Sequence, residues 1–252
     1  MRRLIDPVFR EGIQVYLEEG QGFMVYFFYL VILAILQFLM LIFPAADAKV
    51  WLGPAHLFRF SSVVALILVI YFGLRLANQE FAPWKFQPLK HWFQQGRGGV
   101  LALALSQIGL LALHAIIFIL ISFPLLGWAG AIARTPIRSI LFTLLLLFCY
   151  SLTYGIWGLV GLVFWERKVD SRRVFVRWLF VCLILLSGLV YLPLNPVAFL
   201  LFQLGGVDLG GPLQLWGWRW SPPVVHTLFQ IFLLMLGLLL YGWALKRLKK
   251  SD

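Results

Sequence analysis

The sequence contains six runs of about 20 apolar residues, and each run is bounded by charged residues, proline or glycine. A helical run of this length matches the hydrocarbon thickness of a bilayer. Hydrophobic residues make up 62% of the chain and charged residues 12%, a balance that one water-soluble core could not hide. The pattern predicts an all-α, polytopic membrane protein whose residues 1–252 form one transmembrane domain. The predicted spans are 23–43, 61–77, 100–123, 140–165, 174–192 and 224–245.

Lysine and arginine residues are distributed unevenly between the two faces that six spans would create. With both termini on one face, sixteen of the 21 Lys and Arg residues fall on that face and five on the other. Because positively charged loops stay on the cytoplasmic side of a membrane, we expect both termini to be cytoplasmic. The net charge of +11 comes from short clusters between apolar runs, which argues against nucleic acid as a partner.

Residues 1–22 precede the first span and have the pattern of an interfacial helix. Ile5, Phe9 and Ile13 recur at helical spacing, while charged side chains occupy the opposite side. Gly20 would let the chain bend from the membrane plane into the first span. The segment is either an ordinary amphipathic leader or a functional elbow, and the pattern alone does not separate these two interpretations.

The predicted cytoplasmic connection between spans two and three, residues 78–98, is unusually aromatic. Because exposing many rings to water is costly, such a loop either dips into the lipid headgroup layer or docks on another protein. The rings that need a covering surface are Phe81, Trp84, Phe86, Trp92 and Phe93.

Residues 194–222, between spans five and six, form the other irregular segment. Asn195 and Pro196 precede a short apolar stretch, and Gly205 and Gly206 follow it. Eight to ten apolar residues are too few to cross a bilayer, so the segment predicts a re-entrant or interfacial helix pair. The alternative is an ordinary loop whose tryptophans lie at the headgroup level.

Sequence motifs for catalysis are missing from the chain. It has no phosphate-binding Gly-x-x-x-x-Gly-Lys-Ser/Thr motif and no Cys-x-x-Cys, His-Glu-x-x-His or Gly-x-Ser-x-Gly. The apolar runs carry essentially no carboxylates, which argues against a membrane protease or a proton-coupled carrier. We therefore expect no enzymatic activity, no catalytic residues and no cofactor in this chain.

Two histidines within apolar runs raise the alternative of haem ligation in an electron-transfer subunit. His114 falls near the middle of its span and His226 near the end of another, whereas two axial ligands must lie at the same depth. We expect both to form hydrogen bonds between helices and to bind no metal. Small residues of the fourth span, spaced for close helix packing, are Ser151, Gly155, Gly158 and Gly161.

The order of these features resembles the membrane subunit of an ATP-binding-cassette exporter of the type 2 permease family. That family has an N-terminal interfacial helix, six spans, a coupling helix between spans two and three, and re-entrant helices between spans five and six. The matching pieces are the helix at 5–19, Glu80, Ser122-Phe-Pro-Leu-Leu126, the basic segment 166–173, Leu194-Asn-Pro196 and the basic tail 244–250.

The resemblance implies a transmembrane permease that is driven by a separate ATPase subunit, which would bind ATP and Mg. A second permease chain, identical or paralogous, would complete the transporter in the prokaryotic plasma (inner) membrane. The coupling residues would be Glu80, Phe81, Trp84, Phe86, Trp92 and Phe93, with Glu80 pairing with a nearby base or helix end. Because the spans carry little charge, we expect the exported substrate to be lipid-like or amphiphilic. The alternative function is a non-transporting membrane scaffold or assembly factor.

Overall fold

The computed structural model describes residues 7–42, 53–94, 99–215 and 218–250. Within these residues, six helices are long and apolar enough to cross a membrane, which confirms the predicted number of spans. The spans are α2 (Gln21–Ile42), α3 (Leu57–Ala77), α5 (Val100–Ile132), α6 (Ile137–Phe164), α7 (Val169–Val181) extended by a π-helical turn (Cys182–Leu186) and α8 (Ser187–Val190), and α10 (Pro222–Lys250).

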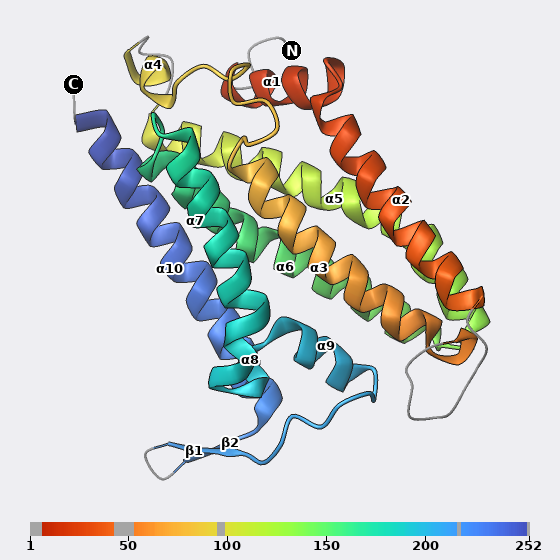
Figure 1. Cartoon of the computed structure of the whole chain (residues 1–252). Helices are drawn as coiled ribbons and strands as arrows, with labels where there is room; N and C mark the ends of the chain where they lie inside the picture. The colour runs from red at the N-terminus through yellow and green to blue at the C-terminus, as the bar shows by residue number, and fades with distance from the viewer. Residues whose placement is uncertain (1–6, 43–52, 95–98, 216–217, 251–252) are drawn as a thin grey trace.

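The six spans form one bundle, and both termini lie at the same end of it (Figure 1). We call this the basic end, and the opposite end, where β1 (Leu213–Leu215) pairs antiparallel with β2 (Trp218–Trp220), the hairpin end. This hairpin is an addition to the predicted all-α fold.

A short helix, α1 (Pro7–Ile13), and a π-helical turn (Gln14–Glu18) lie across the basic end before α2 begins. They confirm the helix predicted before the first span, except that Ile5 lies outside the described residues. Gly20 has a φ of +73°, a conformation that glycine adopts without strain, and the chain bends there into α2.

The third span is longer than predicted. Its apolar run was expected to end at Phe123, before a proline, but α5 continues through Pro124 to Ile132. A proline inside a helix removes one backbone hydrogen bond, and neighbouring helices can compensate for that loss in a membrane bundle. Leu126 and Ala129 beyond the proline are buried, so packing carries this helix past the predicted boundary.

The core lies along the contact between α3 and α6. Gly158 of α6 faces the backbone of α3 so closely that an added Cβ would lie 2.4 Å from the carbonyl oxygen of Leu74. Gly155 similarly accommodates Leu111 of α5, and Gly161 accommodates Phe175 of α7. These contacts confirm the close packing predicted for the fourth span, and they show which neighbour each glycine admits.

Polar side chains within the bundle pair laterally between helices. His114 of α5 shares a 2.5 Å hydrogen bond with the hydroxyl of Tyr26 of α2. His226 of α10 contacts the Tyr150 hydroxyl through Nε2 at 2.6 Å and the carbonyl oxygen of Pro193 through Nδ1 at 2.7 Å. The prediction that both histidines form hydrogen bonds between helices is confirmed.

Three hydrogen bonds join the parallel helices α6 and α10 at a constant register. After the pair between Tyr150 and His226, Gln230 Nε2 donates to the Tyr154 hydroxyl at 2.9 Å, and Trp157 Nε1 donates to the Leu233 carbonyl at 3.1 Å. The α6 partners recur at i, i+4 and i+7, so one helical face carries the whole set. Hydrogen bonds of this kind stabilise membrane helices by roughly 0.6–2 kcal/mol each.

Replacing Gly158 with alanine should destabilise the bundle, because the new methyl group would force α3 and α6 apart. We expect a loss of about 1–3 kcal/mol, measured by thermal unfolding in detergent. Gly242→Ala in α10 is the matched control, because no atom lies within 4 Å of its added Cβ. Equal stabilities of the two variants would contradict the close contact.

The two ends of the bundle should differ in accessibility from outside the cell. In a chain whose Cys149 and Cys182 are replaced by serine, an impermeant thiol reagent applied to intact cells should label Gln214→Cys at the hairpin end. Lys250→Cys at the basic end should react only after permeabilisation, because positively charged ends remain inside. Labelling of Lys250→Cys in intact cells would reverse the expected orientation.

Candidate functional site: the connection between α3 and α5

The connection between α3 and α5 begins with a reversal of the chain at Gln79. This residue has a φ of +54°, and the backbone N–H of Glu80 donates to the Arg75 carbonyl while that of Gln79 donates to the Leu76 carbonyl. Both bonds together form the Schellman ending of a helix. The left-handed residue is usually glycine, so the local backbone carries a cost of roughly 1–2 kcal/mol that the surrounding contacts must offset.

Glu80 is the residue that those contacts hold. Its side chain is buried, Oε2 accepts a 2.9 Å hydrogen bond and ion pair from Arg75 Nε, and Oε1 accepts a 3.0 Å bond from the Asn78 amide. The Arg75 guanidinium also lies over the ring of Phe81, 4.5 Å from its centroid. The prediction that Glu80 pairs with a nearby base is confirmed, and the pair fixes the start of the connection against α3.

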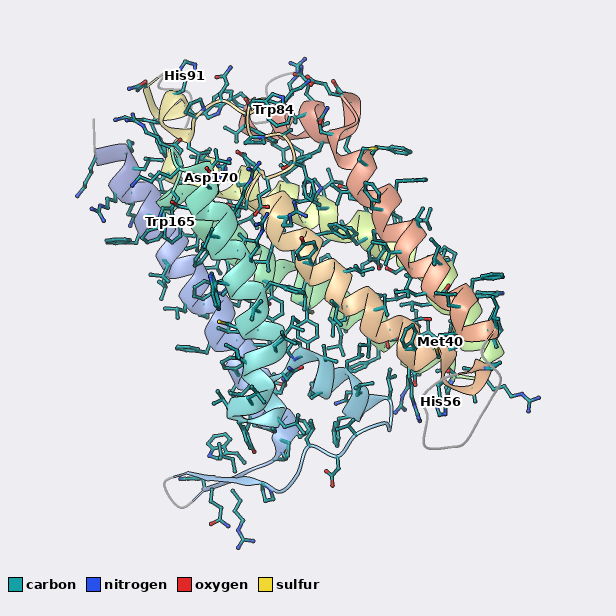
Figure 2. The ribbon with its side chains drawn as sticks, in the orientation of Figure 1. Met40, His56, Trp84, His91, Trp165 and Asp170 are labelled. Atoms are coloured by element: carbon teal, nitrogen blue, oxygen red, sulfur yellow. The ribbon has the colours of Figure 1, made fainter. Side chains whose placement is uncertain are left out.

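The aromatic rings of the connection are mostly covered by the chain itself, which corrects the expectation that all five need an outside surface. Phe86 is 9% exposed and Trp92 is 8% exposed, while Phe81 and Phe93 are half-buried. Trp84 alone is exposed, at 74%, and Figure 2 places it beside α1 at the basic end. An internal cover was not visible in the sequence because it comes from the N-terminal segment.

That cover consists of α1 and the π-helical turn that follows it. The ring of Phe86 packs on Tyr16 at a centroid distance of 5.1 Å, and the Tyr16 hydroxyl donates to the Leu76 carbonyl at 2.8 Å. The backbone N–H of Gln87 donates to Glu11 at 2.9 Å. The N-terminal segment therefore joins the end of α3 to the connection through both apolar and polar contacts.

Two carboxylates of this cover have shifted pKa values in opposite directions. Burial raises the pKa of Glu11, and the hydrogen bond from the Gln87 backbone only partly opposes this shift. A 2.6 Å hydrogen bond from Lys85 lowers the pKa of Glu19, which lies at the surface. Neutralising Glu11 is therefore easier than neutralising Glu19, although both hold the same connection.

The connection contains one helix within its described residues, α4 (Leu89–Gln94), which is about one and a half turns long and lies at the basic end (Figure 1). The backbone N–H of Lys90 donates to Glu166 at 3.1 Å, which ties α4 to the junction between α6 and α7. The end of the connection, residues 95–98, lies outside the described residues.

At the hairpin end, Asn195 and Pro196 begin α9 (Pro196–Gln203) as the sequence predicts. Asn195 Oδ1 accepts hydrogen bonds from the backbone N–H groups of Val197 and Ala198 at 2.8 and 3.1 Å, an N-terminal cap. Its amide donates to the Ile184 carbonyl at 2.7 Å, inside the π-helical turn of span five. This single side chain therefore fixes the angle between α9 and the preceding span.

The second half of the predicted helix pair is wrong. α9 ends in another Schellman turn at Gly205, which has a φ of +67°, with Gly206 N–H donating to the Leu201 carbonyl. The chain then returns through an irregular stretch and the hairpin. The glycine and proline residues at 205–212 favour this irregular path over a second helix. Arg59 of α3 donates to the Leu204 carbonyl at 2.9 Å and holds the end of α9.

A hollow of about 350 Å³, which we call the seam hollow, opens between α6 and α10 beside Phe199 of α9. Apolar side chains dominate its walls, and Tyr150, Thr153 and Gln230 supply polar groups. The Oε1 atom of Gln230 is enclosed and has no hydrogen-bond partner among the described residues. The seam hollow is thus a mostly apolar space, and Gln230 in its wall carries a buried oxygen without a hydrogen-bond partner.

The described residues contain no cluster of three or more His, Cys, Asp or Glu side chains that could hold a metal ion. No protein-family model, curated protein or solved structure matches this chain. Sequence reasoning missed Glu11, Glu19 and Lys85 as supports of the connection. Their only signal was charge in an otherwise apolar chain, and it did not indicate which segments would meet.

Replacing Glu80 with glutamine should loosen the connection, because Arg75 would keep its charge without a carboxylate partner. We expect a loss of about 1–3 kcal/mol in thermal unfolding and faster amide hydrogen exchange in residues 78–94. Glu18→Gln, at an exposed position, is the control and should change neither. Unchanged exchange in Glu80→Gln would show that the N-terminal cover alone holds the connection.

Proposed function

We propose that this chain is the transmembrane permease subunit of an ATP-binding-cassette exporter, similar to the type 2 permease family. It resides in the prokaryotic plasma (inner) membrane with both termini in the cytoplasm. A separate ATPase subunit docks at the basic end and supplies energy from ATP and Mg. A second permease chain, identical or paralogous, pairs with this one around the transport route.

The observation that carries this proposal is the firm attachment of the α3–α5 connection to the end of the bundle. Glu80 ties its start to Arg75, and Glu11 and Glu19 tie its middle to the N-terminal segment. A connection that is held at several points can transmit a displacement of the ATPase to the spans. A loose loop would change its own conformation instead and leave the spans in place.

The exposed ring of Trp84 supplies the contact for the partner. Tryptophan is enriched among the residues that dominate binding energy at protein interfaces, and here it projects from a supported backbone. The buried rings of Phe86 and Trp92 have a different role, because they hold the connection in place. The coupling surface is therefore centred on Trp84.

The seam hollow favours an amphiphilic substrate. Its apolar walls suit an acyl or prenyl chain, and the enclosed acceptor of Gln230 suits a hydroxyl or amide donor on the same molecule. The chain lacks a nucleotide-binding motif, so ATP hydrolysis belongs to the partner in this mechanism. Binding and hydrolysis of ATP would shift the permease pair between two conformations that differ in access to the route.

Purification of the tagged chain from its native membrane, followed by mass identification of its partners, tests the proposal. We expect an ATPase to co-purify, and Trp84→Ala to reduce its recovery at least about tenfold while the chain still inserts into the membrane. Trp178→Ala is the control, because this ring is also exposed but lies on the span α7.

Two outcomes would contradict the proposal in different ways. If no ATPase accompanies the unmodified chain, the chain is not a permease subunit of this kind, and a membrane scaffold becomes the better interpretation. If Trp84→Ala retains a full complement of ATPase and unchanged hydrolysis, the docking role of this ring is wrong and it serves the lipid headgroup layer.

A further inference from the structure

A buried arginine whose Nε atom lacks a hydrogen-bond partner lies near the α3–α5 connection. Arg172, near the start of α7, is 4% exposed, and its Nε atom has no hydrogen-bond partner within the described part of the chain. Burying a guanidinium is costly unless its N–H groups are satisfied. The Nε atom of Arg172 is therefore a donor whose hydrogen bond is not supplied within the described residues.

The carboxylates nearest to Arg172 are already engaged by other groups. Glu80 and Glu166 act on Arg172 through their charge. Glu80, however, accepts hydrogen bonds from Arg75 and Asn78, and Glu166 accepts one from the backbone N–H of Lys90. Neither carboxylate forms a direct ion pair with Arg172. Neither carboxylate therefore occupies the Nε donor of Arg172.

Arg172 lines a hollow of about 230 Å³, which we call the Arg172 hollow. Among the described residues that line it, Lys90 and Arg167 are also basic and only Glu166 is acidic, so cations outnumber anions in its lining. Val169, the first residue of α7, forms part of the wall, and the start of a helix adds partial positive charge. The volume is several times the ~30 Å³ that one water molecule occupies in the liquid, enough for a phosphate group.

The depth of the Arg172 hollow indicates where its anion comes from. α3 ends at Ala77, α6 ends at Phe164 and α7 begins at Val169, so three spans end or begin around it, at the level where we expect the membrane surface. Asp170, labelled in Figure 2, marks this level at the start of α7. Phosphates of anionic lipids lie at the same level, and basic pockets between spans bind such headgroups.

We propose that the Arg172 hollow binds the phosphate of an anionic phospholipid headgroup. Arg172 donates from the bottom of the hollow, and Lys90 and Arg167 add charge at its rim. Because the α3–α5 connection forms one wall through Phe86 and Gln87, the bound headgroup also supports the connection. This site does not depend on the proposed transport function.

Titration of the purified full-length chain with dioleoylphosphatidylglycerol in neutral detergent tests the site, with thermal unfolding as the readout. The lipid should raise the unfolding temperature of the unmodified chain, while dioleoylphosphatidylcholine should not. Arg172→Gln should weaken the apparent lipid affinity about tenfold or more, because a charge-assisted hydrogen bond is lost. Arg177→Gln is the matched control, since it removes an exposed charge from the same helix.

The remaining measurements distinguish a phospholipid from other ligands that the Arg172 hollow could bind. An equal rise with inorganic phosphate alone would identify a soluble phosphate as the source of the anion and overturn the lipid assignment. Equal lipid responses of Arg172→Gln and the unmodified chain would also overturn it. If the lipid does not raise the unfolding temperature of the unmodified chain, the lipid assignment is also wrong. A carboxylate from a partner protein then becomes the better candidate for the anion. If Arg172→Gln does not fold, the double variant Lys90→Gln, Arg167→Gln replaces it in the titration. A lipid response of this double variant equal to that of the unmodified chain would overturn the assignment.

Discussion

The close approach of α3 and α6 at Gly158 is the contact on which the rest of the structure depends. Within lipid, the hydrophobic effect does not favour the association of two apolar helices. Their association therefore depends on short-range contacts such as van der Waals packing. A glycine at this position lets the backbone of α6 meet the Leu74 carbonyl of α3 directly. The contact lies near the basic end of α3, and it therefore places the residues that follow Ala77.

α3 connects both irregular regions of the molecule through an arginine near each of its ends. Arg75 holds Glu80 and the start of the α3–α5 connection at the basic end, while Arg59 holds the Leu204 carbonyl after α9 at the hairpin end. A displacement of α3 along its axis would act on both regions together. This linkage is a physical route by which a partner at the basic end could influence the hairpin end.

Several polar groups inside the bundle find a partner on a neighbouring helix. Tyr26 with His114 and Tyr150 with His226 are neutral pairs whose hydrogen bonds fix the rotation of the helices. Other buried polar atoms of the described residues have no hydrogen-bond partner, among them Ser61 Oγ, Thr143 Oγ1 and Ser151 Oγ. Gln230 and Arg172 differ from these because both line hollows. An unsatisfied buried group is costly, so one that belongs to a residue lining a hollow is a candidate contact for a ligand.

The sequence by itself determined the six spans, the helix before them, the pairing of Glu80 with a base, the short helix that follows Asn195 and Pro196, and the hydrogen bonding of both histidines. These features depend on residue type and short spacing, which a linear pattern records. Only the tertiary structure decided that α5 continues past Pro124, that the chain covers Phe86 and Trp92, and that Arg172 remains without a hydrogen-bond partner at Nε. Those outcomes depend on which distant segments meet, and in this chain most segments are similarly apolar, so composition could not distinguish one neighbour from another.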